Sequence, residues 1–302
     1  MPGRIVVAGG SGFLGQALNA ALAQEGYDVV VLTRGSSTDG SNRIIQWNPD
    51  GTRGAWAAAV DGAHAVVNLA GESIAGKRWS AAHKARILDS RVQATRSIVA
   101  AIRSAATPPV VLINGSAVGY YGPRGDEVLT ETAAAGADFL AEVCVRWEAE
   151  ASIASSERTR VVFLRTGLVL ARDGGALPPM LPPFRFGVGG PVGSGRQYWP
   201  WIHRDDWIGL VRWTMQSSNV SGPVNATAPQ PVTNKAFAAA LGKAMHRPAF
   251  MAAPAFALRL LLGEMADALI LSGQRAVPER AERGGFPFRY SRLEGALATL
   301  FT

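Results

Sequence analysis

A glycine-rich turn between an apolar run and a helical pattern, within residues 4–26, restricts this chain to a small set of folds. Residues 5–8 are apolar and mostly β-branched, which is typical of a strand buried on both faces of a sheet. The turn that follows reads GGSGFLG, and apolar residues then recur at helical spacing up to Gly26. Residues 29–32 form a second apolar run. This order predicts a β-loop-α-β unit, the opening of a doubly wound α/β fold with a parallel Rossmann sheet.

The spaced glycines of this turn predict a binding site for a dinucleotide. Gly9 permits a tight exit from the strand, Gly12 lets the backbone approach a pyrophosphate, and Gly15 lets the helix lie close to the sheet. A helix that begins here presents free N–H groups and its positive end to phosphates. A glycine-rich turn without a ligand is the alternative, and the position between a strand and a helix favours the binding site. The residues expected at the cofactor are Gly9, Ser11, Gly12, Phe13, Leu14 and Gly15.

The end of the second apolar run favours NADP over NAD. Sites for NAD usually place an acidic residue there, about 20 residues beyond the glycines, to bind the ribose 2′-hydroxyl. This chain has Arg34 instead, and the next acidic residue is Asp39. A guanidinium would pair with the 2′-phosphate of NADP, with Thr33 and Ser36 as nearby hydrogen-bond donors. The alternative is that Arg34 is a solvated cation in a loop.

Composition limits the class of protein. The 302 residues are 48% apolar and 18% charged, so the chain has the material for a large core. The net charge of +7 is scattered along the sequence, which favours small anionic ligands over a specific nucleic acid. One cysteine and four widely spaced histidines predict neither a disulfide nor a metal site. We expect a cytoplasmic protein without a signal peptide or membrane segment, because a strand pattern opens the chain and charged residues interrupt its longest apolar stretch, 256–271.

Further apolar runs continue the alternation of strands and helices. Strands are expected at 43–47, 65–71, 110–113 and 161–164, and helices at 56–60, 83–106 and 138–155. This alternation predicts a doubly wound parallel sheet. The end of the run at 65–71 should lie beside the glycine loop, because the carboxyl ends of parallel strands share one edge of a sheet. The residues there that we expect at the cofactor are Asn68, Leu69, Ala70 and Gly71.

The composition of the sequence changes near Gly167. Glycine and proline are dense between residues 173 and 200, which suits a wall built of loops. Residues 222–226 are expected to return to the sheet as a strand, and residues 256–271 to form an apolar helix that buries most of its surface. We therefore predict an NADP-binding Rossmann domain at 1–170, joined by the returning strand. Residues 171–302 would form an interleaved substrate-side region with a helical C-terminal domain.

Several segments, which together cover nearly the whole chain, carry a resemblance to a known family. They are GGSGFLG (9–15), LTR (32–34), NLAGE (68–72), NGSAVGYYG (114–122), LRTGLVL (164–170), GGPVGSGRQYWPWIHRDD (189–206) and the tail segment 247–280. They resemble the extended or atypical branch of the short-chain dehydrogenase/reductase superfamily, in particular NAD-dependent epimerase/dehydratase-like proteins with a small C-terminal domain of unknown function. The resemblance implies a substrate cleft between the Rossmann domain and the C-terminal part. It also implies an NADP-binding oxidoreductase or a nucleotide-sugar epimerase-like protein.

The resemblance further implies an atypical active site. Members of the superfamily use a Ser or Thr at the end of a strand and a Tyr-x-x-x-Lys on the following helix to exchange a proton with the substrate. Ser116 fits the first role. With Glu148 taken as the usual helix glutamate, Leu140 stands at the Tyr position and Cys144 at the Lys position. The Asn often found on the preceding helix appears here as Arg91.

Another acid must then serve if hydride transfer occurs. Tyr121, and after it Tyr120, are the candidates in the loop that follows Ser116, and an aromatic wall is the alternative for both. Arg91 would either lower the pKa of a tyrosine or bind an anionic group of the substrate. Cys144 would be either a reactive thiol or a small buried apolar residue.

The loop-built wall supplies candidates for substrate contact. Arg196 would clamp an anion, Trp199 would line a sugar- or ring-binding wall, and His203 would act as an acid or base. Solvation is the alternative for Arg196 and core packing for Trp199, while the resemblance implies that Asp206 ties loops together. The expected substrate is small and polar or anionic, with a nucleotide-sugar as one candidate, and a homodimer is left open. The alternative function is a non-catalytic NADP-binding regulatory or sensor protein, in which the cofactor sets the position of the C-terminal part.

Overall fold

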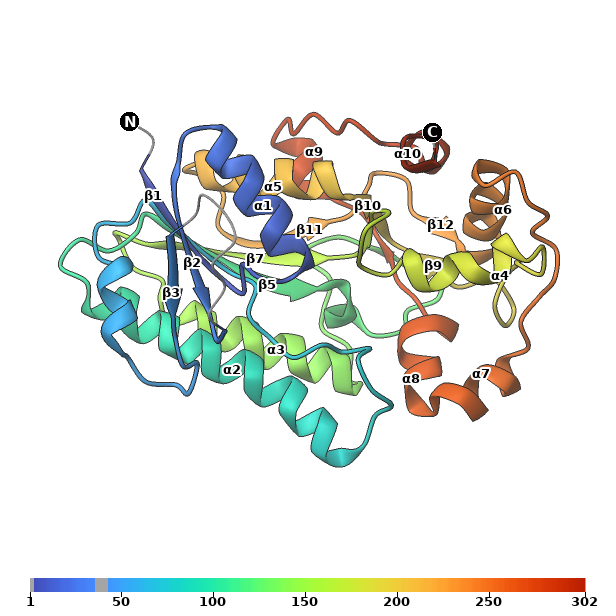
Figure 1. The fold of residues 1–302 in the computed structure, drawn as a ribbon, viewed down its shortest axis with the longest axis horizontal. Coiled ribbons are helices and arrows are strands. Elements are labelled where there is room, and N and C mark those ends of the chain that lie inside the picture. The colour runs from blue at the N-terminus through green and yellow to red at the C-terminus, as the bar shows by residue number, and fades with distance from the viewer. Residues whose placement is uncertain (1–2, 36–42, 302) are drawn as a thin grey trace.

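A parallel sheet forms the centre of the computed structural model, which describes residues 3–35 and 43–301 (Figure 1). Its seven strands follow the order β11-β7-β5-β4-β1-β2-β3, and every neighbouring pair is parallel. The strands are β1 (Arg4–Ala8), β2 (Asp28–Thr33), β3 (Arg43–Gln46), β4 (Ala65–Asn68), β5 (Val111–Ala117), β7 (Arg160–Thr166) and β11 (Gly222–Ala226). The predicted doubly wound Rossmann sheet is therefore confirmed, and residues 222–226 join its edge as expected.

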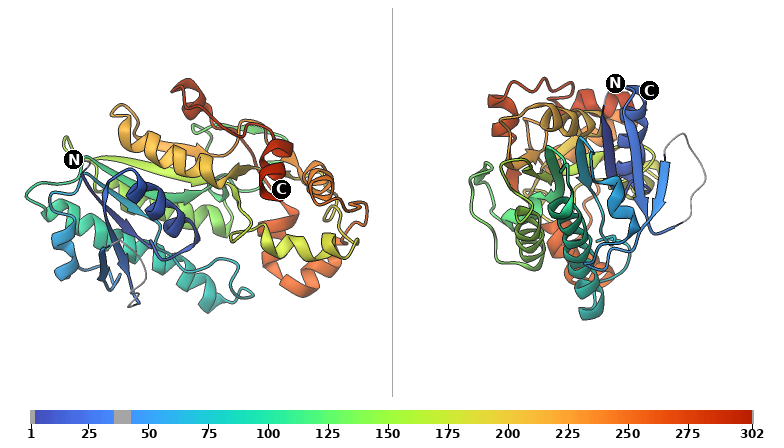
Figure 2. Two further views of the ribbon diagram at one scale, coloured as in Figure 1. Left: turned by 45° about the horizontal axis from the view of Figure 1, so that its top comes forward. Right: turned by 90° about the vertical axis from the view of Figure 1, so that its left-hand side faces the viewer.

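Helices cover both faces of this sheet (Figures 1 and 2). One face carries α1 (Phe13–Gln24) and α5 (Arg204–Gln216). The other carries α2 (Ala81–Ser104) and α3 (Phe139–Ser152), with the 3-10 helix η1 (Ala55–Ala59) beside them. Because successive strand residues point to opposite faces, Val7 and Val31 pack with α1 and α5, whereas Val6 and Val30 pack with α2. Burial on both faces explains why these strands are continuous apolar runs.

The second half of the chain builds a smaller, irregular body beyond the carboxyl ends of the strands (Figure 2). Its helices are η3 (Pro178–Met180), α4 (Leu181–Arg185), α6 (Asn234–Ala244), α7 (Ala255–Leu262), α8 (Glu264–Ala266), η4 (Asp267–Leu271) and α10 (Leu293–Phe301). Helix α9 (Glu279–Arg283) instead lies near α5, beside β11, with Ala281 buried in the core of the sheet (Figure 1). Short strands pair as β8 (Leu168–Leu170) with β10 (Trp201–His203) and as β9 (Tyr198–Trp199) with β12 (Val232–Thr233). A separate apolar core holds this body together, with Trp201, Phe237 and Leu297 fully or almost fully buried in it.

The tail of the chain returns to the nucleotide-binding half. Strand β13 (Arg275–Ala276) pairs in parallel with β6 (Val128–Leu129), which follows the 3-10 helix η2 (Val118–Tyr121) after β5. A small buried cluster forms there around Tyr121, Leu129 and Ala276. The first and last parts of the sequence are thus joined by main-chain hydrogen bonds and by a shared core.

The single apolar helix expected at 256–271 is wrong. Gly263 adopts φ +63°, a conformation that side chains disfavour, and it ends α7 and separates it from α8. Helix α7 contains no buried residue, and Phe256, Leu260 and Leu261 are 73%, 79% and 71% exposed. Only α8, with Met265 and Ala266, buries apolar residues as the pattern suggested.

Within the described residues, none of the helices combines the length and the apolar character needed to cross a lipid bilayer.

Candidate cofactor and active site

The glycine loop after β1 is folded so tightly that its first and last glycines cannot carry a side chain. Gly9 adopts φ +75°, and a Cβ placed on it would lie 2.8 Å from the backbone of Leu69 and Ala70. A Cβ on Gly15 would lie 2.5 Å from Gly10 Cα and 2.6 Å from the Gly9 carbonyl oxygen. The loop therefore holds the start of α1 close to β1, in the manner of a dinucleotide-binding turn.

The start of α1 suits an anion. Gly12 precedes the helix and has no side chain to cap the first N–H groups, and the first turn contains no acidic residue. The free N–H groups and the positive end of the helix dipole are therefore available to a phosphate. Phe13 packs its ring against Gly174 and Gly175, so the loop-rich second half closes over this end of the helix.

The end of β2 brings together residues that suit a phosphorylated ribose. The hydroxyl groups of Ser11 and Thr33 lie 3.2 Å apart, and Thr33 Oγ1 also accepts the N–H of Gly35 at 3.3 Å. Arg34 is exposed, and its carbonyl oxygen accepts a hydrogen bond from the side chain of Gln46 at 3.2 Å. Ser36, which we expected as a further donor, lies outside the described residues.

The end of β4 lies against the glycine loop, as the packing of Gly9 on Leu69 and Ala70 shows. Asn68 is fully buried and donates hydrogen bonds to Thr95 Oγ1 at 2.9 Å and to Asn114 Oδ1 at 2.8 Å. Its own Oδ1 accepts the N–H of Ala70 at 3.2 Å. The side chain of Asn68 thus shapes the turn, whereas the backbone after it forms the wall beside the loop.

Arg91 binds the backbone that follows the same turn. It is buried, and its Nη1 donates to the carbonyl oxygens of Glu72 at 3.0 Å and Ile87 at 2.9 Å. Its guanidinium lies 5.1 Å from the ring centre of Trp147, and a Cβ on Gly71 would come within 3.0 Å of it. The structure therefore places Arg91 as a backbone anchor rather than as a group that faces a substrate.

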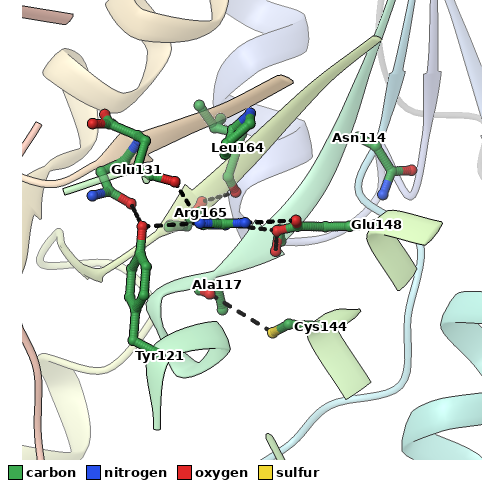
Figure 3. Close-up of polar contacts among 12 residues, drawn as sticks. Asn114, Ala117, Tyr121, Glu131, Cys144, Glu148, Leu164 and Arg165 are labelled. Atoms are coloured by element: carbon green, nitrogen blue, oxygen red, sulfur yellow. Dashed lines mark hydrogen bonds and ion pairs between the residues drawn. The ribbon is translucent and has the colours of Figure 1, made fainter. Parts of the chain in front are cut away.

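Arg165 and Glu148 form a buried ion pair near the end of β5 (Figure 3). Arg165 of β7 binds Glu148 of α3 through two hydrogen bonds of 2.8 Å, one to each carboxylate oxygen. Ser116 donates its hydroxyl proton to the same carboxylate at 2.7 Å. Both charged side chains are less than one tenth exposed, so the carboxylate is held in one orientation. Ser116 is thereby fixed as a donor to Glu148, which leaves its oxygen lone pairs as acceptors.

Tyr121 belongs to this buried network and not to an open site. Its hydroxyl donates to Asn225 Oδ1 at 2.6 Å and accepts from Arg165 Nη1 at 3.1 Å, and the residue is fully buried. Burial raises the pKa of Tyr121 to about 12, although Arg165 opposes the shift. The geometry therefore argues against Tyr121 as a proton donor to a substrate. Figure 3 shows Arg165 lying between Tyr121 and Glu148.

Tyr120 occupies a different environment from its neighbour. It is only half-buried, and its ring lies edge-to-face with the ring of Tyr121 at 5.4 Å. The guanidinium of Arg165 lies 3.4 Å from the Tyr120 ring centre, a cation–π contact. Tyr120 is the phenol near Ser116 in sequence that retains some exposure.

Helix α3 carries the residues that the resemblance sets at the positions of the dyad and of the helix glutamate. Leu140, Cys144 and Glu148 follow each other at intervals of one turn and are all buried. The Cys144 Sγ lies 3.7 Å from the carbonyl oxygen of Ala117 (Figure 3). Burial raises the pKa of the Cys144 thiol to about 11, so the group is a neutral thiol at physiological pH. Neither Leu140 nor Cys144 supplies the proton donor or the positive charge of the usual pair.

The three candidates for substrate contact have different environments. Arg196 is exposed on its loop. Trp199 packs against Phe237, with ring centres 5.2 Å apart, and belongs to the apolar core of the second half. His203 is buried, accepts the N–H of Asp205 at 3.2 Å and has its ring centre 4.1 Å from that of Tyr290. The structure thus places Trp199 and His203 in packing roles.

Asp206 is in the first turn of α5 and holds the segment that precedes α10, an architectural role like the one that the resemblance implied. Its carboxylate is buried and accepts the backbone N–H groups of Arg289 and Tyr290, both at 2.9 Å.

Sequence reasoning did not identify Arg165, Glu131 or Asn225, although an arginine inside a buried strand was a usable signal. Across residues 3–35 and 43–301, no cluster of His, Cys, Asp and Glu side chains is arranged to hold a metal ion.

Comparison with known proteins places these features in a family. Residues 5–226 match the model of the NAD dependent epimerase/dehydratase family, and residues 253–300 match a domain of unknown function, DUF1731. The chain is 42% identical to epimerase family protein Mb2239 of Mycobacterium bovis, over 97% of this chain and 96% of that protein. It is 40% identical to epimerase family protein YfhF of Bacillus subtilis, over 98% and 97% of the two chains.

Solved structures agree with this result. The human epimerase family protein SDR39U1, crystallised with NADPH, superposes with a TM-score of 0.91 at 34% identity, over 98% of each chain. A nucleoside-diphosphate sugar epimerase from Corynebacterium glutamicum gives 0.81 at 33% identity, over 100% of this chain and 58% of that one. The cofactor expected from the sequence, NADP, agrees with the NADPH bound by the human protein. Two thirds or more of the sequence thus fits one family model, and the chain belongs to the NAD dependent epimerase/dehydratase family.

Proposed function

We propose that this chain is an NADP-dependent oxidoreductase or nucleotide-sugar epimerase-like enzyme of the short-chain dehydrogenase/reductase type, without the usual Tyr-x-x-x-Lys dyad. One observation carries the proposal: the uncapped glycine loop of α1 and the hydroxyl of Ser116 lie at the same edge of the sheet. Strand β4 alone separates β1 from β5, so the ends of these two strands are about 10 Å apart. That edge is where open α/β sheets bind their ligands.

When bound, the cofactor would exchange a hydride with the substrate, accepting it as NADP⁺ or donating it as NADPH, and the chain's own residues would bind the cofactor and orient the substrate. The start of α1 would hold the diphosphate, and Arg34 would pair with the 2′-phosphate beside Ser11 and Thr33. Ser116 would accept a hydrogen bond from a substrate hydroxyl, because its own proton is committed to Glu148. We assign the proton exchange to Tyr120 in place of Tyr121.

The substrate class remains that expected from the sequence, a small polar or anionic molecule. A nucleotide-sugar is supported by the 33% identity to the Corynebacterium glutamicum protein, which is described as a nucleoside-diphosphate sugar epimerase. We also propose that the protein works in the cytoplasm on small molecules, and that its domains divide near residue 170. A homodimer is the first assembly to test.

The alternative is an NADP-binding regulatory or sensor protein without turnover. Two arguments favour it: the resemblance sets Leu140 and Cys144 at the positions of the proton-transferring pair, and the hydrogen-bond network around Arg165 continues to the tail of the chain. A panel of alcohols separates the two functions. Purified protein is mixed with NADP and each compound, and the absorbance of the NADPH that forms is followed.

Under the enzymatic proposal, Ser116→Ala and Tyr120→Phe lower the turnover of any active compound by about 100-fold or more, since each removes a group at the reacting atoms. Tyr121→Phe is the matched control, because it removes the same hydroxyl from a buried position and should lower stability more than turnover. Turnover that is unchanged in both Ser116→Ala and Tyr120→Phe would refute this site.

The choice of NADP is tested at Arg34. Arg34→Gln should weaken NADPH binding by roughly 10- to 100-fold, because a charge-assisted hydrogen bond to the 2′-phosphate is lost. NADH binding should not change. Quenching of tryptophan fluorescence measures both affinities. Arg158→Gln, an exposed arginine near the start of β7 at the opposite edge of the sheet, is the control. Equal losses for NADPH and NADH would contradict the assignment.

A further inference from the structure

A cavity of about 510 Å³ opens between the nucleotide-binding half and the C-terminal part, and the catalytic proposal above does not use it. It lies where α2 and α3 begin and where α8 faces them (Figure 1). Its walls include Trp79, Lys84 and Leu88 from the start of α2, Phe139 from α3 and Glu264 from α8. In sequence α2 follows β4 and α3 follows η2 and β6 after β5, so both helix starts lie in connections that leave the carboxyl ends of these strands.

Two aromatic rings form one wall of this cavity. Trp79 and Phe139 meet edge-to-face, with ring centres 5.2 Å apart and planes at 76°. The indole N–H of Trp79 donates to the carbonyl oxygen of Ile74 at 2.9 Å, which fixes the orientation of the ring. A wall that is already ordered loses little side-chain entropy when a ligand binds. The arrangement suits a planar ring in the cavity.

The charges around the cavity favour an anion. Lys84 Nζ lies 2.7 Å from Glu264 Oε1 and 4.6 Å from the ring centre of Phe139. The guanidinium of Arg78 packs against Gly263, with its Nε 3.0 Å from the position of a Cβ there. Lys84 and Glu264 are thus paired with each other at the cavity, and Arg78 is a second cationic side chain beside the start of α8. The Glu264 side chain is 58% exposed, and an ion pair this open contributes little to stability.

We propose that this cavity binds the anionic, ring-bearing part of the substrate, and that the anion of the ligand takes the place of Glu264 beside Lys84. The proposal rests on the proposed function for the identity of the ligand as a substrate, and it narrows the class to a carboxylate or phosphate carried on a planar ring. The cavity volume falls in the range of sites for small molecules. Binding would separate Glu264, and with it α8, from the start of α2.

Benzoate and phenyl phosphate are suitable probes, with benzamide as the uncharged match of benzoate. Ligand-observed NMR measures their affinities for the full chain saturated with NADPH, so that the dinucleotide site is filled. We expect both anions to bind, and benzamide to bind at least about tenfold more weakly, because it lacks the charge. The tighter of the two anions identifies a carboxylate or a phosphate ester as the natural group.

Two variants test whether the probes bind at this cavity. Lys84→Met keeps the stem of the side chain but removes its charge, and should weaken both anions by roughly tenfold or more. Glu264→Gln removes the competing carboxylate and should tighten them roughly two- to fivefold. The matched controls are Lys243→Met and Glu294→Gln, exposed residues of α6 and α10, and they should change nothing.

The outcomes separate this proposal from the proposed function. If NADPH binds and neither anion does, the cavity proposal is overturned while the proposed function stands. The same holds if Lys84→Met binds the anions as tightly as the wild type does and benzamide binds as tightly as benzoate does. If NADPH does not bind but the anions still depend on Lys84, the proposed function fails and the cavity remains a site for an organic anion.

Discussion

Arg165 is the residue on which the buried part of the site depends. Its guanidinium binds both oxygens of Glu148, and its Nη1 donates to the hydroxyl of Tyr121 and to the carbonyl oxygen of Glu131 at 3.2 Å. A charged group buried this deeply is tolerated only with such partners. The orientation of Ser116 follows from this arrangement, since Glu148 is its hydrogen-bond acceptor.

Removal of one partner of this pair should be costly. Arg165→Met should lower the free energy of unfolding by about 3–5 kcal/mol, because it leaves the carboxylate of Glu148 buried without a counter-charge. The double variant Arg165→Met, Glu148→Met should recover most of the loss, because two apolar side chains then fill the site. Urea unfolding followed by circular dichroism measures both. A double variant as unstable as the single one would show that the charge is not the cause.

His203 should make stability depend on pH. Burial lowers its pKa below the ordinary 6.5, against the pull of Asp205 and Asp206. Just below pH 6.5 the unfolded chain therefore binds more protons than the folded one, and stability is lost as the pH falls from 6.5 towards the folded pKa. The expected slope is at most about 1.4 kcal/mol per pH unit. Urea unfolding between neutral and mildly acidic pH should show a smaller slope in His203→Gln, whereas His246→Asn, an exposed histidine, should keep the full slope.

At the scale of elements, the junction of β1 and α1 has the least room for change. In Gly15→Ala the new methyl group would meet the Gly9 carbonyl oxygen and Gly10, so the helix must move away from the sheet. We expect NADPH affinity to fall about tenfold or more and the melting temperature to fall. Gly295→Ala, in α10 with open space around it, should leave NADPH affinity unchanged and stabilise its helix by about 0.5–1 kcal/mol. Thermal unfolding with and without NADPH tests both, and an intact affinity in Gly15→Ala would contradict our account of the loop.

The elements also show what the sequence could and could not predict. Strand and helix periodicity predicted the seven parallel strands and the helices that precede β7, because burial on both faces leaves a strong pattern, but it did not predict α5. The pattern failed at Gly263, since apolar spacing does not reveal a left-handed backbone or the lack of a packing partner for α7. It also missed the partners of Ser116. Glu148 and Arg165 lie 32 and 49 residues away, and only the register of β5 with β7 places Arg165 opposite Ser116.

At the scale of the whole molecule, buried side chains of the nucleotide-binding half hold the tail by its main chain. Glu131 accepts the N–H of Arg280, and Asn225 donates to the carbonyl oxygen of Val277 at 2.9 Å. Asp206 accepts two further N–H groups of the tail. Strand β13 adds its pairing with β6. None of these contacts involves a side chain of the tail.

Recognition of a backbone by side chains has a consequence for how such a chain can diverge. Any residue except proline offers the same amide, so these hydrogen bonds survive most substitutions in the tail, whereas the buried Ala276 and Ala281 and the side-chain hydrogen bonds of Arg280 restrict those three positions. A single inserted or deleted residue between α8 and α10 would instead shift every amide past its acceptor. Related chains should therefore tolerate most substitutions in this segment far better than insertions or deletions.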